Sequence, residues 1–174
     1  MRSLITSSRA AILLIVGALA VGCSASSAPP AKDARWLVAP DAWPRFSAAL
    51  EGDWRGRAGG GAEVSVSYHS IAGGSAVAET FGSPGHATMT LFHPDHGGLV
   101  ATHYCAQGNQ PRLRAVSADG LHLRFQQADI TDLDPGEAQL VELELTIDGD
   151  KLERLELYRA PDGSVERTLW HFER

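Results

Sequence analysis

From Trp54 to the end of the chain, apolar and polar residues alternate, and clusters of Gly, Pro, Asn or Asp interrupt the alternation every eight to twelve residues. Residues two apart in a strand point to the same face, so this period predicts strands with one inner face. Short connections such as Gly73-Gly74, Asp119-Gly120 and Asp162-Gly163 supply the positive φ angles of tight hairpins. The pattern therefore predicts an antiparallel all-β domain in which neighbours in sequence pair with each other.

We expect a short helix, then ten strands, with one longer loop at 129–138. The helix is predicted at 43–50, with Asp41 placed to cap it. The strands are predicted at 52–57, 62–72, 75–81, 87–93, 98–106, 112–118, 121–128, 139–148, 151–160 and 164–172. A flat sheet of this kind would expose two edges, and closure into an up-and-down barrel removes them. A two-sheet sandwich also has alternating inner faces and is the alternative architecture.

The N-terminal segment has the order of a secretory signal. Two arginines precede an apolar run of about a dozen residues, which is shorter than the roughly 20 residues of a transmembrane helix. Residues 19–23, Leu-Ala-Val-Gly-Cys, resemble the lipobox of bacterial lipoproteins, which implies cleavage before Cys23 and lipid on that cysteine. An ordinary signal peptide cut after Ala20 is the alternative. We expect a signal peptide at 1–22, a lipidated cysteine and flexible tether at 23–40, and one domain at 41–174.

The predicted mature chain is acidic and has one unmodified thiol. Removal of residues 1–22 takes away two of 15 basic residues and none of 21 acidic ones, which leaves a net charge of −8. Such a chain lacks the basic footprint that nucleic acid requires. With lipid on Cys23, Cys105 has no partner for a disulfide. We expect a monomer in the cell envelope, held by its lipid. Ser24 resembles the sorting signal for an outer membrane, facing the periplasm, in a Gram-negative cell.

Residues 102–112 read Thr-His-Tyr-Cys-Ala-Gln-Gly-Asn-Gln-Pro-Arg, an unusual density of polar side chains around one hairpin. This segment resembles the signature of a family of uncharacterised bacterial calycin-like (lipocalin-like) domains. The earlier parts of that family pattern are Gly-x-Trp, here ending at Trp54, and a Tyr–Gly–Glu segment, here Tyr68, Gly73 or Gly74, and Glu79. The resemblance covers most of 50–133. It implies a calycin-like barrel with Trp54 plugging one end, and it implies no particular activity.

The signature supplies the candidate site. We expect His103, Glu79 and Arg112 to project into the barrel, with Asn109 and Gln110 near its rim. An arginine and a glutamate in an apolar cavity either pair or await a ligand, because an unpaired buried ion is very costly. The candidate ligand-binding residues are Glu79, His103, Tyr104, Asn109, Gln110 and Arg112. The predicted function is binding of a small, partly polar or anionic ligand, with Arg112 as the anion's partner.

Two other functions fit the same residues. One is an enzyme that uses Glu79 or His103 as acid and base, and the other is an inert envelope protein whose polar residues only fix strand register. Of these, binding is preferred to catalysis. Cys105 is interpreted as a small buried hydrophobe. The pair His93 and His96 lacks further ligands at a recognisable spacing, so no metal or other cofactor is expected.

The charges of the last strands are interpreted as their solvated outer face, and His171 as a residue at the end of the barrel. The residues assigned to that outer face are Glu142, Glu144, Glu153, Glu156, Arg154 and Arg159.

Overall fold

The strands lie close to the ranges that the alternation of apolar and polar residues predicts. The computed structural model describes residues 41–57, 61–82 and 85–174, so the predicted signal peptide, lipidated cysteine and tether at 1–40 lie outside the described residues. The elements are α1 (Ala42–Leu50), β1 (Gly52–Arg57), β2 (Glu63–Ile71), the short 3₁₀ turn η2 (Ala72–Gly74), β3 (Ala76–Phe81), β4 (Thr88–Asp95), β5 (Gly98–Tyr104), β6 (Gln110–Asp119), β7 (His122–Thr131), β8 (Gln139–Asp148), β9 (Lys151–Arg159) and β10 (Val165–Glu173). In this part of the chain, no helix has the length and hydrophobicity to span a bilayer.

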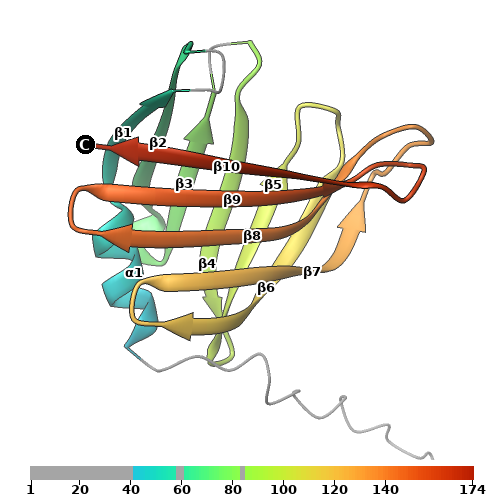
Figure 1. Cartoon of the computed structure of the whole chain (residues 1–174). Helices are drawn as coiled ribbons and strands as arrows, with labels where there is room; N and C mark the ends of the chain where they lie inside the picture. Colours follow the sequence, from blue (N-terminus) through green and yellow to red (C-terminus); the bar gives the residue numbers. More distant parts are fainter. Residues whose placement is uncertain (1–40, 58–60, 83–84) are drawn as a thin grey trace, which may run out of the picture. The chain divides into compact units, whose positions relative to one another are not determined.

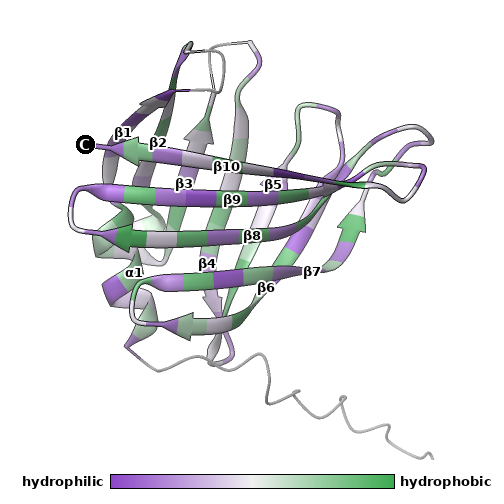
Figure 2. Ribbon diagram, viewed as in Figure 1, coloured by the Kyte–Doolittle hydropathy of each residue, from purple (hydrophilic) through white to green (hydrophobic). Residues whose placement is uncertain are grey.

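The strands form a closed antiparallel barrel in which each pairs with its neighbours in sequence, and β1 pairs with β10 (Figure 1). The predicted up-and-down barrel is confirmed, and the sandwich alternative is wrong, because one continuous ladder joins all the strands. Figure 2 shows hydrophobic and hydrophilic residues alternating along β8 and β9, as a sheet with one inner face requires.

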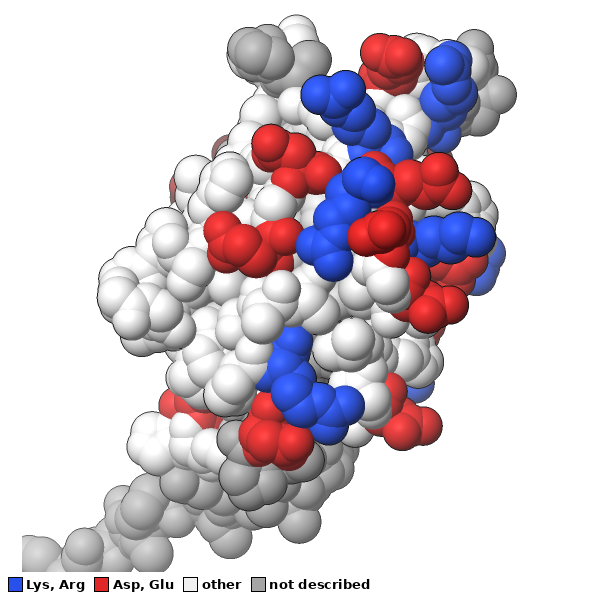
Figure 3. Space-filling view, turned by 90° about the vertical axis from the view of Figure 1, so that its left-hand side faces the viewer, with Lys and Arg blue, Asp and Glu red and all other residues white. Residues whose placement is uncertain are grey.

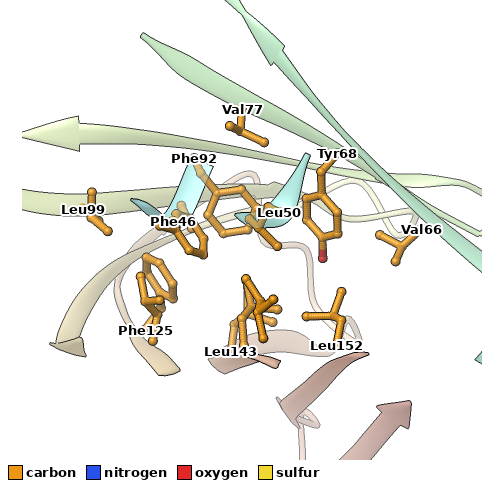
Figure 4. Close-up of a cluster of buried hydrophobic side chains, with 14 of the residues drawn as sticks. Phe46, Leu50, Val66, Tyr68, Val77, Phe92, Leu99, Phe125, Leu143 and Leu152 are labelled. Atoms are coloured by element: carbon orange, nitrogen blue, oxygen red, sulfur yellow. The ribbon is translucent and has the colours of Figure 1, made fainter. Parts of the chain in front are cut away.

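The helix closes one end of the barrel. Phe46 and Leu50 of α1 are buried among the strand side chains, and the Phe46 ring lies 5.6 Å from that of Phe92 (Figure 4). Trp54 is also fully buried, and its Nε1 donates to the Leu50 carbonyl at 2.8 Å. This is the end-plugging position that the resemblance implied. Arg174 covers the ring from outside, with its guanidinium 4.4 Å from the ring centroid.

The predicted cap of α1 is wrong in one respect. Asp41 occupies the N-cap position, but its side chain makes no capping hydrogen bond. Its carboxylate instead accepts a hydrogen bond from Arg45, one helical turn ahead, at 3.3 Å. The helix is therefore held mainly by its buried apolar face, in keeping with the small intrinsic stability of a helix this short.

The end of the barrel away from α1 is more loosely paired. Strands β7 and β8 pair only over residues 122–126 and 142–146, although β7 continues to Thr131. Strands β5 and β6 pair over 100–102 and 112–114. Strand β1 meets β10 only at residues 55–56 and 172–173. We call this second end the open end, because β7 and β8 separate there.

Closure of the barrel depends on a close approach at Gly56. This residue pairs with Phe172 across the β1–β10 seam. A Cβ atom at position 56 would lie 2.3 Å from the carbonyl oxygen of His171 and 2.9 Å from Cδ1 of Phe172. The nearer atom belongs to the backbone, so it cannot move aside without moving the strand.

We predict that Gly56→Ala lowers the free energy of unfolding by about 1–3 kcal/mol, because overpacking at this level forces the backbone to shift. The measurement is urea unfolding followed by circular dichroism. Arg55→Ala, on the outer face of the same strand, is the matched control and should change stability by no more than about 0.5 kcal/mol. Equal stability of Gly56→Ala and the wild type would show that the seam is not tightly packed.

Candidate functional site

Four polar side chains form a row across the inner wall of four adjacent strands. Tyr68 of β2 lies opposite Glu79 of β3, Glu79 opposite Thr90 of β4, and Thr90 opposite His103 of β5. All four are fully buried. The Tyr–Gly–Glu pattern in the sequence is thus a hairpin whose turn brings a tyrosine and a glutamate together inside the barrel.

A second set of polar side chains reaches this row from β9 and β10. Arg154 has no exposed surface, and its Nη1 donates to Oε2 of Glu79 at 2.9 Å. Its Nη2 lies 2.9 Å from Oε1 of Glu156, and Oε2 of Glu156 accepts a hydrogen bond from Trp170 at 3.0 Å. One guanidinium therefore lies between two carboxylates in the interior. We call the residues of the row and of this set the interior network, and they are Tyr68, Glu79, Thr90, His103, Arg154, Glu156, Tyr158 and Trp170.

Burial and charge act in opposite directions on these ionisable groups. Burial raises the pKa of Glu79, while the Arg154 guanidinium opposes that shift. Burial alone would lower the pKa of Arg154, but the carboxylates of Glu156 and Glu79 outweigh it and raise the pKa. The pKa of Tyr68 rises well above its usual value through burial and the nearby Glu79 carboxylate. Arg154 therefore stays charged, and it keeps a carboxylate partner on each side.

The hydrogen bonds of the network run in one direction. The Thr90 hydroxyl donates to Oε1 of Glu79 at 2.7 Å, so its oxygen must accept from Nδ1 of His103, 3.0 Å away. A neutral imidazole that donates from Nδ1 accepts at Nε2. The Nε2 atom lies 3.2 Å from the hydroxyl of Tyr158, which must therefore donate to it. The chain of donors runs from Tyr158 through His103 and Thr90 to the Glu79 carboxylate.

Three buried donor atoms of the network find no hydrogen-bond partner among the residues that the structure describes. They are the Tyr68 hydroxyl and the Nε and Nη2 atoms of Arg154. Nη2 of Arg154 approaches Glu156 as an ion pair without hydrogen-bond geometry. Buried polar groups of this kind are generally met by ordered water.

Exposure rises toward the open end. Tyr158, Trp170 and Cys105 are partly exposed, in contrast to Arg154 and Glu79 beneath them. Phe81 packs edge-on against Trp170 at 5.2 Å and lies under the Arg154 guanidinium at 4.9 Å. The partly exposed members of the network are therefore aromatic, and Trp170 lies opposite Arg154 across the β9–β10 pair.

The sequence predictions for this site are right for two residues and wrong for a third. Glu79 and His103 do project into the barrel. Arg112 does not. Its side chain is 51% exposed and pairs with Asp129 on the outside, because the register sets Arg112 opposite Thr102, an outward residue. The alternation of β6, with Leu113 buried, already places Arg112 on the outer face.

The other three candidates lie around the signature hairpin. Tyr104 points outward and is 44% exposed. Asn109 is buried, but its amide donates to the Glu137 carboxylate at 2.8 Å and to the Ala138 carbonyl at 3.1 Å. Gln110 accepts from Thr131 at 2.8 Å. The structure thus shows Asn109 and Gln110 tying the hairpin to neighbouring segments at the rim.

The sequence interpretation missed the cation of the site. Arg154 and Glu156 were assigned to the solvated outer face of the last strands, and both are buried. The turn after β8 contains the information that was overlooked. Its two-residue loop pairs Asp148 with Lys151 and Ile147 with Leu152. Leu152 therefore points inward, and so do residues 154, 156 and 158 by alternation.

A separate groove of about 1000 Å³ lies on the outer surface along the β1–β10 seam. Its lining mixes basic and acidic side chains, and Arg57 pairs with Glu63 there at 3.7 Å. On the face shown in Figure 3, acidic and basic side chains likewise lie next to one another. This mixed surface favours no ligand charge, so the interior network remains the candidate site.

Comparisons with known proteins give the fold and not a function. No model of a known protein family matches the chain, and no curated protein matches it significantly. Among solved structures, the chain is similar to the crystal structure of Rv2717c from M. tuberculosis, with a TM-score of 0.52 and 21% sequence identity. The alignment covers 79% of this chain and 98% of that one. At this identity the likeness supports the barrel fold alone.

We predict that His103 makes the fold sensitive to acid. Burial lowers the pKa of His103 to about 3, and the Arg154 charge acts in the same direction. An unfolded histidine titrates near 6.5, so the folded state binds fewer protons between these values. The stability from neutral His103 is thus fully present above pH ~6.5 and falls by about 1.4 kcal/mol per pH unit as the pH drops toward 3.

The measurement is urea unfolding at several pH values between 7 and 4. His103→Gln should be less stable than the wild type at pH 7, and the difference should shrink as the pH falls. His86→Gln removes an exposed histidine and controls for the substitution. Parallel curves for wild type and His103→Gln would mean that His103 does not lose its proton on folding.

Proposed function

We propose that this protein is a lipid-anchored envelope protein whose barrel binds a small, partly polar ligand at the open end. The main support is the position of the interior network. Its members Tyr158 and Trp170 are partly exposed, and β7 and β8 separate at the same end of the barrel as Tyr158. Binding sites of this type combine apolar walls with a few convergent polar groups. The opposite end is closed by α1, and the proposed entrance is therefore the open end.

The arrangement favours a polar ligand over an anionic one. Arg112, the predicted partner of an anion, lies outside the barrel. Arg154 is inside, but Glu79 and Glu156 already flank it. A ligand anion would have to compete with both carboxylates for the same guanidinium.

Acid–base catalysis by Glu79 or His103 has less support than binding. Both nitrogens of His103 are used within the protein, and Glu79 has no exposed surface. An inert structural role is the second candidate, favoured by the filled interior near α1, where Phe46, Phe92 and Phe125 pack together.

Ligand retention tests the binding proposal. Native mass spectrometry of protein purified from its own envelope should show an added mass on the wild type. Cys105→Phe, which fills the outer layer beside Tyr158, should lose that mass. Met89→Phe adds the same ring on the exposed outer face and should keep it. Unfolding curves of each variant check that the fold is intact.

Arg112→Ala distinguishes binding inside the barrel from binding at Arg112 on its outer face. Retention of the added mass by this variant is expected, because the side chain is outside the barrel, whereas its loss would restore the predicted role of Arg112. Retention by Cys105→Phe would contradict binding at the open end. A wild-type protein with no added mass would favour the inert role.

The lipid anchor is tested by intact-mass analysis of the mature protein from its native host. We expect a chain that begins at Cys23 and carries diacylglycerol, and Cys23→Ser should abolish both the lipid mass and membrane attachment. Cys105→Ser, which changes the other cysteine, should keep the anchor. An unmodified chain that begins at Val21 would mean that the ordinary signal-peptide cut is used instead.

A further inference from the structure

Resting on the proposed binding at the open end, we propose that the site recognises a hydrogen-bond donor, preferably a protonated amine, with the Tyr158 hydroxyl oxygen as its acceptor. This assigns the chemical class of the ligand. The proposed ligand carries a positive charge, whereas the sequence analysis predicts a partly polar or anionic ligand. Three features of the described residues support it, namely the direction of the hydrogen-bond chain, the charge balance of the interior and the partly exposed aromatic side chains.

The hydrogen-bond chain decides what Tyr158 can offer. Ionised Glu79 can only accept, so the Thr90 hydroxyl hydrogen points to it. His103 must then donate from Nδ1, and its Nε2 takes the hydrogen of Tyr158. With that hydrogen used, the phenol oxygen has only lone pairs left for a ligand. A buried carboxylate thus makes a partly exposed tyrosine, three hydrogen bonds away, an acceptor.

The charge balance favours a cation. The ionisable groups of the network are the carboxylates of Glu79 and Glu156 and the guanidinium of Arg154. With both carboxylates ionised, the interior has one negative charge in excess. Glu156 is slightly exposed, at 5%, whereas Glu79 has no exposed surface, and Glu156 lies between Arg154 and Tyr158 along β9. A cation that enters at the open end meets the unbalanced charge first, and charges interact strongly where water is excluded.

The outer layer suits an organic cation. Tyr158 and Trp170 are partly exposed aromatic side chains, and Phe81 packs against Trp170. The interior already holds one guanidinium over an aromatic face, since Arg154 lies 4.9 Å from the Phe81 centroid. Ammonium groups bind the faces of such rings through their quadrupoles. A carboxylate would face the same rings and the carboxylate of Glu156 with no free cation among the described network residues.

Three probes of similar size test this chemistry. They are 2-phenylethylammonium, 2-phenylethanol and phenylacetate, which share a phenyl group and a short tail and differ in the polar group. Each is titrated into the wild-type protein, and the indole N–H signal of Trp170 is followed by ¹H–¹⁵N NMR. We expect the ammonium to bind tightest, the alcohol next, and the carboxylate at least about tenfold more weakly than the ammonium.

Tyr158→Phe keeps the ring and removes the acceptor. Its affinity for the ammonium should fall by about tenfold, the size of one hydrogen bond to a charged group. Tyr104→Phe removes a hydroxyl from the outer face and should bind like the wild type. Equal or tighter binding of phenylacetate would overturn the donor class and leave binding at the open end intact. A failure of all three probes to shift the Trp170 signal would overturn the binding proposal itself.

The direction of the hydrogen bonds from Tyr158 to Glu79 has its own test. The ¹⁵N shifts of the His103 ring distinguish the two neutral tautomers. We expect the hydrogen on Nδ1 in the protein without any probe. A hydrogen on Nε2 would mean that Tyr158 keeps its own hydrogen free to donate, and the inference would fail even if a ligand binds.

Discussion

The guanidinium of Arg154 is the group on which the barrel interior depends. It has no exposed surface and lies between the carboxylates of Glu79 and Glu156. A charge in such a place is tolerated only when its partners are in position, and removal of one partner of a buried ion pair typically costs about 3–5 kcal/mol. Because Glu79 comes from β3 and Arg154 from β9, this requirement holds opposite walls of the barrel at a fixed separation.

The same charge orders the rest of the network. Arg154 favours the ionised form of Glu79, and an ionised Glu79 fixes the hydrogens of Thr90, His103 and Tyr158. These bonds cross three neighbouring strands and return to β9. A slip of one residue in any of the strands would turn its inner side chain outward. The network therefore fixes the strand register as well as the positions of its hydrogens. Hydrogen bonds select one register more strictly than apolar packing alone.

Local pattern was enough to predict the fold, but only part of the site. Alternation and turn residues act within one hairpin, so they place Glu79 and His103 on the inner face. The same rule puts Arg112 outside and Arg154 inside, and both errors came from judging the side chains by their charge. The contact of Arg154 with Glu79 could not be predicted this way, because it joins residues 75 apart in sequence and exists only after the barrel closes.

The two ends of the barrel differ in how far side chains fill the interior. Near α1, Phe46, Phe92 and Phe125 fill the interior, and the charged layer above them satisfies most of its bonds internally. Burial holds the pKa of His103 far below neutrality, so this imidazole is neutral at physiological pH. A molecule that binds as we propose would meet acceptors and aromatic faces held in place by this network. In the proposed binding role, such a pattern would select a ligand by its hydrogen-bond donors and its charge.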